Sequence, residues 1–263
     1  MAAAPMREEA AGWYLYGVVA ADAEAPGGAP SVDPANGVVS LDEGPVAALA
    51  SRVSLVEFDE ETLPQRLADA GWLEEKIRAH EQVLEAALAS TAVVPCRFCT
   101  VYRSEEDLRA FLAGHADELR DALATLEGRV ELGVKALVDP ARFSAELEAA
   151  SQATSGRAYL EARREEQRLG AELVRFQGEL AANLHERLLA AAEDGVSLAL
   201  QSREVSGRDE EMLFNGAYLV GDREKFEEAL AEAAQGAREH GVELELTGPW
   251  PPYNFVPAEL GRP

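Results

Sequence analysis

The first half of the chain alternates apolar runs with clusters of turn-forming residues. Residues 12–19 (GWYLYGVV) are rich in aromatic and β-branched side chains, which predicts a strand. Residues 23–37 are dense in Pro, Gly, Asp and Asn, so they predict a loop. Short strands are predicted at 38–41 and 54–58, with residues 45–49 forming a short strand or helix between them.

The next part of the chain has the periodicity of helices. Apolar residues recur every three or four positions from Gly71 to about Ser90, with Glu and Arg on the opposite side, so this stretch predicts an amphipathic helix. Ser104, followed by three acidic residues, is typical of a capping box that opens a second helix. Its apolar stripe runs from Leu108 to Leu126 and stops at Gly128. We therefore place the boundary between the two halves at residues 127–129.

The second half predicts the order strand, long helix, strand, strand, helix, strand. This βαββαβ order is that of a ferredoxin-like split βαβ unit. The predicted fold class is α+β with two domains, an N-terminal α+β domain at 1–128 and a C-terminal ferredoxin-like domain at 129–263 with a long helical extension. The strands are expected at 130–138, 196–202, 213–220 and 242–246, and the helices at 156–192 and 224–240.

The net charge of the chain argues against two classes of partner. The chain has 48 acidic and 24 basic residues, a formal net charge of -24. Such an excess repels phosphate backbones and anionic lipid, so it argues against nucleic-acid and membrane partners. No stretch approaches 18 apolar residues without a charge, and the N-terminus lacks the pattern of a secretory signal. We expect a cytoplasmic protein.

The cysteines form a single CxxC, Cys96 and Cys99. This spacing suits a redox pair or half of a zinc site. A tetrahedral zinc site would need a second CxxC or a histidine pair, and the sequence has neither. Structural or incidental thiols are the favoured interpretation, and we predict no metal and no cofactor.

The histidines are also better explained by structure than by catalysis. His80 and His115 fall on apolar helical stripes, as expected of core or interface side chains holding one hydrogen bond. No histidine pair has the i, i+4 spacing of a metal-binding face, and there is no P-loop, GxSxG or HExxH motif. A catalytic role for one histidine stays open as an alternative, but the prediction is a protein that is not an enzyme.

Two segments carry unusual residue combinations. Residues 95–102 (PCRFCTVY) place an arginine among apolar and aromatic residues, and residues 246–256 (LTGPWPPYNFV) pack three prolines and three aromatics into eleven positions. The tail is either a rigid strand exit that covers a core edge or an exposed apolar anchor for a partner, since Trp and Tyr dominate binding hot spots. The candidate partner-binding residues are Arg97, Phe98, Trp250, Pro251, Pro252, Tyr253 and Phe255.

These segments resemble those of the gas vesicle F/L proteins. Residues 95–101 are similar to that family's P-x-R-F-G-T-V pattern, with Cys99 standing where the family carries Gly, which puts a tight backbone turn at this position in question. Residues 126–135 resemble its G-R-x-E-x-G-V-K strand. Residues 13–19, 213–220 and 247–256 complete a resemblance that covers nearly the whole chain, and the last of these segments is the most specific.

The resemblance implies a non-enzymatic accessory or minor structural protein in gas vesicle assembly, located at the gas vesicle or in the cytoplasm. Its implied partners are the gas vesicle major shell protein, which is small and hydrophobic, and other gas vesicle accessory proteins. The alternatives are a small-molecule enzyme or a ligand-binding regulatory module on the ferredoxin-like half. The enzyme would require an apolar pocket with convergent polar groups, for which Arg97 and His185 are candidates.

Overall fold

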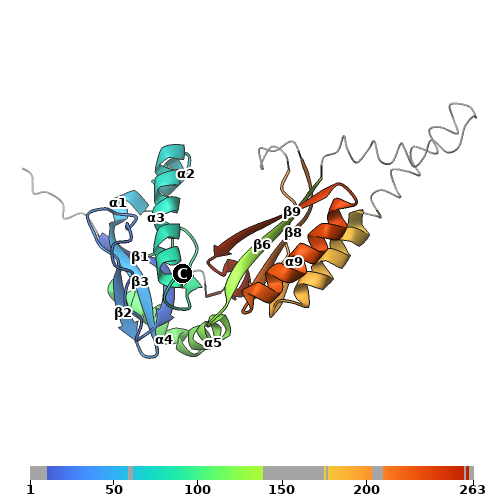
Figure 1. Cartoon of the computed structure of the whole chain (residues 1–263). Helices are drawn as coiled ribbons and strands as arrows, with labels where there is room; N and C mark the ends of the chain where they lie inside the picture. Colours follow the sequence, from blue (N-terminus) through green and yellow to red (C-terminus); the bar gives the residue numbers. More distant parts are fainter. Residues whose placement is uncertain are drawn as a thin grey trace, which may run out of the picture. The chain divides into compact units, whose positions relative to one another are not determined.

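The computed structural model describes residues 11–58, 62–138, 175, 177–202, 210–257 and 259–260 (Figure 1). Its contacts group the chain into two compact units, the first Met1–Gly128 with Pro251–Pro263 and the second Arg129–Trp250. The predicted domains, 1–128 and 129–263, differ from this grouping at the C-terminal segment and stay a prediction. Each unit is built around its own antiparallel sheet, so the chain has a mixed α+β fold.

The sheet of the first unit is centred on β1. Strands follow the order β2-β3-β1-β4, and β5 also pairs with β1. Every pairing is antiparallel, and the register shifts between Leu15 and Gly17. A Cβ at Gly17 would lie 2.8 Å from the Val94 carbonyl oxygen, so only glycine fits this close approach. The strands are β1 (Ala11–Ala20), β2 (Val39–Glu43), β3 (Val46–Ser54), β4 (Val94–Pro95) and β5 (Val101–Tyr102).

Helices cover this sheet and explain why β1 is buried along almost its whole length. Residues of α3 share a buried core with Tyr14 and Tyr16 of β1. Helices α4 and α5 also contact β1, and their buried leucines lie outside that core. The helices are α1 (Leu55–Phe58), α2 (Leu63–Leu67), α3 (Ala70–Leu88), α4 (Glu105–Gly114) and α5 (Ala116–Leu126).

The prediction of a strand at 54–58 is wrong. The apolar run Val46–Ser54 forms the strand and pairs with β1 along its length, and the chain then turns into α1. The predicted single helix after Ser104 is also wrong, because it breaks at His115, whose φ of -117° and ψ of 16° leave the helical region. Gly114, a poor helix former, directly precedes this break. The Ser104 cap is confirmed, since its side chain accepts from the Asp107 amide.

The second unit has a sheet of order β7-β8-β6-β9 with every pairing antiparallel. Helix α9 and the helix of residues 177–189, gold in Figure 1, pack on the same face of this sheet. Leu184, Leu188, Phe226 and Leu230 bring the two helices into one core with the strands. The elements are β6 (Val130–Val138), β7 (Asp194–Ser197), β8 (Glu211–Val220), α9 (Arg223–Arg238) and β9 (Val242–Trp250).

Two strands of this unit end well away from their predicted ends, whereas the start of β8 at Glu211 is close to the predicted 213. The strand predicted at 196–202 ends at Ser197, and beyond it Asn215 of β8 holds the chain through hydrogen bonds with Leu198 and Ala199. The last strand continues past 246 to Trp250. Of the predicted helix 156–192, residues 177–189 are confirmed as helix, and the part from 156 to 174 lies outside the described residues. None of the helices described is long and apolar enough to cross a membrane.

Candidate functional site

His80 of α3 is the point where separate parts of the first unit meet. Its side chain is fully buried. The Nδ1 atom lies 3.0 Å from the Tyr14 hydroxyl of β1, and Nε2 lies 3.0 Å from the Tyr253 hydroxyl of the C-terminal segment. His80 therefore holds two hydrogen bonds, one more than predicted, and links a strand, a helix and the tail.

The partners of Tyr253 set the direction of these hydrogen bonds. The Tyr253 hydroxyl donates to the Glu81 carboxylate at 3.0 Å, so it accepts from Nε2–H of His80. Nδ1 then accepts from the Tyr14 hydroxyl, whose oxygen accepts from the Cys99 amide at 3.0 Å. We call this series, from the Cys99 amide through Tyr14, His80 and Tyr253 to Glu81, the His80 chain. It requires a neutral imidazole in one tautomer.

Burial sets the ionisation of the His80 chain. It lowers the pKa of His80 to about 4, against a smaller opposing effect of the Cys96 backbone. Burial also raises the pKa of Tyr14 and of Glu81, and the Tyr253 hydrogen bond partly offsets the rise at Glu81. The imidazole is thus neutral at pH 7 with both nitrogens engaged. This arrangement suits a structural histidine rather than a general base.

The two sequence segments singled out above converge on this histidine. The Phe98 ring packs edge-on against His80, with ring centroids 5.9 Å apart, and also lies beside Trp72. Tyr253 reaches the same imidazole from the tail. Arg97, next to Phe98, is exposed, and its carbonyl accepts from Thr100. The sequence alone carried no sign that these segments share a contact.

The tail combines buried and exposed candidates. Pro251 and Pro252 are buried, and Phe255 is half-buried after a short 3-10 turn that begins at Tyr253. Trp250, at the end of β9, keeps 44% of its surface exposed, and its Nε1–H donates to Thr247 Oγ1 at 3.2 Å. The prolines thus fit the interpretation of a segment that covers a core edge, and Trp250 fits that of an exposed anchor. Their partner-binding roles stay predictions.

A second buried network involves the loop at 23–37, which the sequence left without a role. Val32 in this loop is buried; its amide donates to the Tyr16 hydroxyl at 2.9 Å, and its carbonyl accepts from Lys76 Nζ at 2.6 Å. Lys76 is 6% exposed, whereas the neighbouring Ile77, placed on the apolar stripe by its spacing, is 40% exposed. The sequence could have indicated that Lys76 is buried, because Lys76 precedes His80 by four residues and so lies on the same face of α3.

Cys99 occupies a backbone conformation that favours glycine, with φ of 65°. The tight turn therefore exists here without the family's glycine. We expect the Cys99→Gly protein to be more stable than the Cys99→Ala protein, with a free energy of unfolding about 1 kcal/mol higher, because glycine alone avoids the Cβ clash at positive φ. Urea unfolding of both variants measures this difference. Equal stability of the two would show that the backbone at residue 99 is not strained.

Neither cysteine has the character of a reactive thiolate. Burial raises the pKa of Cys96 and of Cys99 to about 12. Within the described part of the chain, no cluster of three His, Cys, Asp or Glu side chains is placed to hold a metal ion. Arg97 and His185, considered above as convergent polar groups, lie in different units, and His185 hydrogen-bonds the Tyr218 hydroxyl at 2.9 Å.

Comparison with known proteins identifies the family of this chain. Residues 12–257 match the family model of the gas vesicle synthesis protein GvpL/GvpF. The chain is 37% identical over 219 residues to gas vesicle protein L of a Streptomyces species, covering 82% of each chain, and 29% identical over 235 residues to gas vesicle protein F of the same strain, covering 85% of this chain and 90% of that one. Its fold matches the crystal structure of GvpF from an Anabaena species with a TM-score of 0.70 at 20% identity, over 94% of this chain and 96% of that one. The chain therefore belongs to the GvpL/GvpF family of gas vesicle synthesis proteins.

Proposed function

We propose that this chain is a non-enzymatic accessory or minor structural protein of gas vesicle assembly that binds the small hydrophobic shell protein, together with other accessory proteins. The observation that carries the proposal is the family match over residues 12–257. The chain would be made in the cytoplasm and act at the growing vesicle. The neutral, fully engaged His80 and the two unreactive thiols support a role without covalent chemistry.

Charge and a local apolar contact suit such a role. A shell subunit with an apolar face aggregates unless a partner covers that face during assembly. A chain of net charge -24 stays dispersed by self-repulsion while a local apolar contact holds the shell subunit. The partner is held without a chemical step, so no catalytic group is needed.

Trp250 is our candidate for that contact. It is 44% exposed, and the hydrogen bond to Thr247 restrains its indole, so binding would cost little additional side-chain ordering. The next residues, Pro251 and Pro252, are buried and limit the backbone freedom of the segment. A large, pre-ordered aromatic side chain of this kind is the commonest type of binding hot spot.

We also propose that the second unit is ferredoxin-like. Its strand order β7-β8-β6-β9, with helices on one face, supports the βαββαβ arrangement predicted from the sequence. Within the family, the higher identity to protein L than to protein F of one Streptomyces strain, 37% against 29%, favours an L-type member.

Replacing Trp250 by Ala tests the proposed contact. We expect at least tenfold weaker capture of the co-expressed shell protein, because truncating a hot-spot tryptophan costs about 2 kcal/mol or more. The matched control is Leu200→Ala, which removes another exposed apolar side chain of the same unit, 56% exposed, and should leave capture unchanged. Equal capture by the Trp250→Ala protein would remove Trp250 from the interface. No capture by the unmodified chain would reject shell-protein binding itself.

A further inference from the structure

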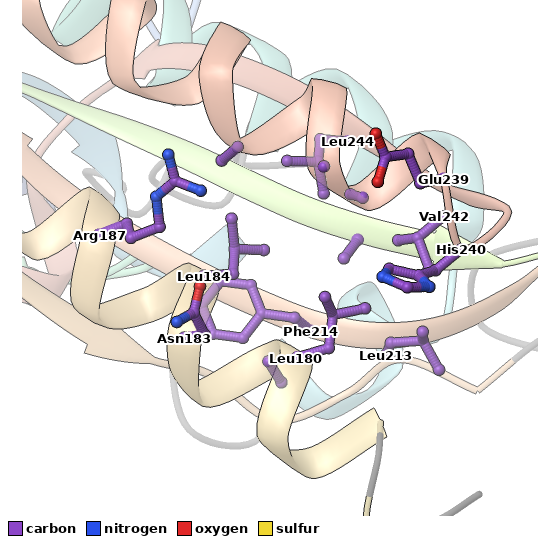
Figure 2. Close-up of a pocket in the computed structure, with 15 residues that line it drawn as sticks. Leu180, Asn183, Leu184, Arg187, Leu213, Phe214, Glu239, His240, Val242 and Leu244 are labelled. Carbon is purple, nitrogen blue, oxygen red and sulfur yellow. The ribbon is translucent and has the colours of Figure 1, made fainter.

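The second unit contains a cavity of about 210 Å³ that none of the roles above uses. It lies between the helix of residues 177–189, α9 and the sheet (Figure 2). The space exists because small residues stand where the two helices face each other: Ala181 on one, and Ala233, Gly236 and Ala237 on the other. The cavity is partly open to solvent, so a small ligand can enter it from outside.

Apolar and polar groups both line the cavity, and the apolar ones make up slightly more than half of its walls. A cavity of 210 Å³ equals roughly seven times the 30 Å³ that one water occupies in the liquid. An aliphatic chain would displace water from the apolar part of the walls and gain contact with it. The apolar side chains are Leu180, Leu184, Leu213, Phe214, Val242 and Leu244.

Polar groups are confined to the two ends. Figure 2 shows Arg187 and Asn183 at one end, and Glu239 and His240 at the other. Arg187 also lies 3.5 Å from Glu232, longer than a hydrogen bond, and the Glu232 side chain is 76% exposed. Exposed pairs of this kind contribute little. Arg187 is itself 45% exposed, and the Glu232 carboxylate balances its charge, so this end carries no net positive charge. The guanidinium has five N–H groups, and those that do not face Glu232 can donate to the carboxylate of a ligand.

Gly236 helps to keep the α9 side of the cavity open. It lies inside α9 (Arg223–Arg238), where glycine costs about 1 kcal/mol relative to alanine. Among the described residues, a Cβ at this position would meet no atom within 4 Å. Packing within the described chain therefore leaves room for an alanine here, whereas a longer side chain would extend into the cavity that Gly236 lines.

We propose that this cavity binds an aliphatic monocarboxylate of roughly five to eight carbons, a length set by its volume. The alkyl chain lies among the leucines and Phe214, and the carboxylate pairs with Arg187. Neither Trp250 nor any member of the His80 chain lines the cavity, so the inference is independent of the gas vesicle role.

Three six-carbon probes test the head group on the full-length protein. Methyl NMR signals of Leu180, Leu184, Leu213 and Leu244 should shift on titration with hexanoate, and hexan-1-ol and hexylamine should bind more weakly. Arg187→Gln should weaken hexanoate binding about tenfold, the value of one charge-assisted hydrogen bond, while Arg238→Gln, an equal change of charge outside the cavity, should not. Preference for the alcohol or the amine, or an unaffected Arg187→Gln protein, would overturn the proposal.

A pair of substitutions at one position tests the cavity itself. Gly236→Leu extends a side chain into the space and should abolish the hexanoate shifts, whereas Gly236→Ala should bind as the unmodified protein does. Both residues favour helix over glycine, so a melting temperature at or above that of the unmodified protein establishes that each variant folds. Ala181→Leu fills the cavity from the other helix, and exposed Ala182→Leu is its control. Undiminished binding by both filled variants, or no hexanoate shifts in the unmodified protein, would overturn the proposal.

Discussion

The free energy of unfolding should fall by roughly 3 kcal/mol through His80 alone as the pH is lowered from 7 to 4. The imidazole is fully buried, and its pKa is lowered from 6.5 to about 4 in the folded protein. At a pH between these two pKa values, the unfolded chain binds a proton at residue 80 that the folded chain does not bind. Stability therefore declines as the pH falls through this window, and below about pH 4 no further loss comes from this group.

The surroundings of His80 define the control. Tyr14 and Tyr253 face its two nitrogens, and Glu81 follows in the same series of hydrogen bonds. Burial raises the pKa of Glu81, so this carboxyl favours the folded state as the pH falls and opposes the effect of His80. Comparison with a variant that changes only position 80 and keeps both hydrogen bonds reduces this contribution, because Glu81 titrates in both proteins.

His80→Gln is suited to that comparison, because its amide supplies a donor and an acceptor without titrating. Urea unfolding of both proteins at pH 7, 6, 5 and 4 gives the two profiles. The unmodified chain should lose roughly 3 kcal/mol more than the variant over this range. Parallel profiles would mean that His80 is solvated or already protonated in the folded state, which contradicts the neutral His80 chain.

Lys76→Met should lower the free energy of unfolding by about 2 to 3 kcal/mol. Lys76 Nζ donates to the Val32 carbonyl at 2.6 Å and lies 3.6 Å from the Glu57 carboxylate. Methionine keeps a similar stem but has no donor, so the buried loop residue Val32 loses the partner of its carbonyl. The loss should appear in urea unfolding.

The exposed Lys225 of α9 provides the control for this substitution. Lys225→Met should change stability by no more than about 0.5 kcal/mol, as expected at a surface position. Hydrogen exchange locates the damage, because the Val32 amide, held by the Tyr16 hydroxyl, should exchange faster in the Lys76→Met protein. Equal stability of the two variants would show that Lys76 does not anchor the loop.

The elements that could be predicted are those whose periodicity agrees with their final packing. Strands β1, β6 and β8 and helices α3 and α9 carry clear patterns and appear near their expected bounds. Residues 55–58 were misassigned because four residues are too few to distinguish a strand from a helical turn. The predicted buried side of α3 is off by one position. Residue hydrophobicity places Ile77 inside and Lys76 outside, but Lys76 is the buried residue because its ammonium donates to the Val32 carbonyl.

The candidate site shows the limit of sequence reasoning more clearly. Phe98 and Tyr253 stood out by residue type, but their common contact with His80 did not. His80 and Tyr253 are separated by 173 positions, and periodicity reports only on neighbours along one element. Likewise, small residues on two helices are unremarkable separately, and they form a cavity only when the helices face each other across Phe214.

Intact mass measurement of the shell protein captured by this chain tests the central claim most directly. The chain and the small shell protein are co-expressed, purified through a tag on the chain, and compared with shell protein expressed alone. Binding without chemistry predicts that the shell protein co-purifies with an unaltered mass, and that capture weakens at least tenfold with Trp250→Ala but not with Leu200→Ala. A shell protein absent from the eluate, or recovered with a changed mass, would contradict the account.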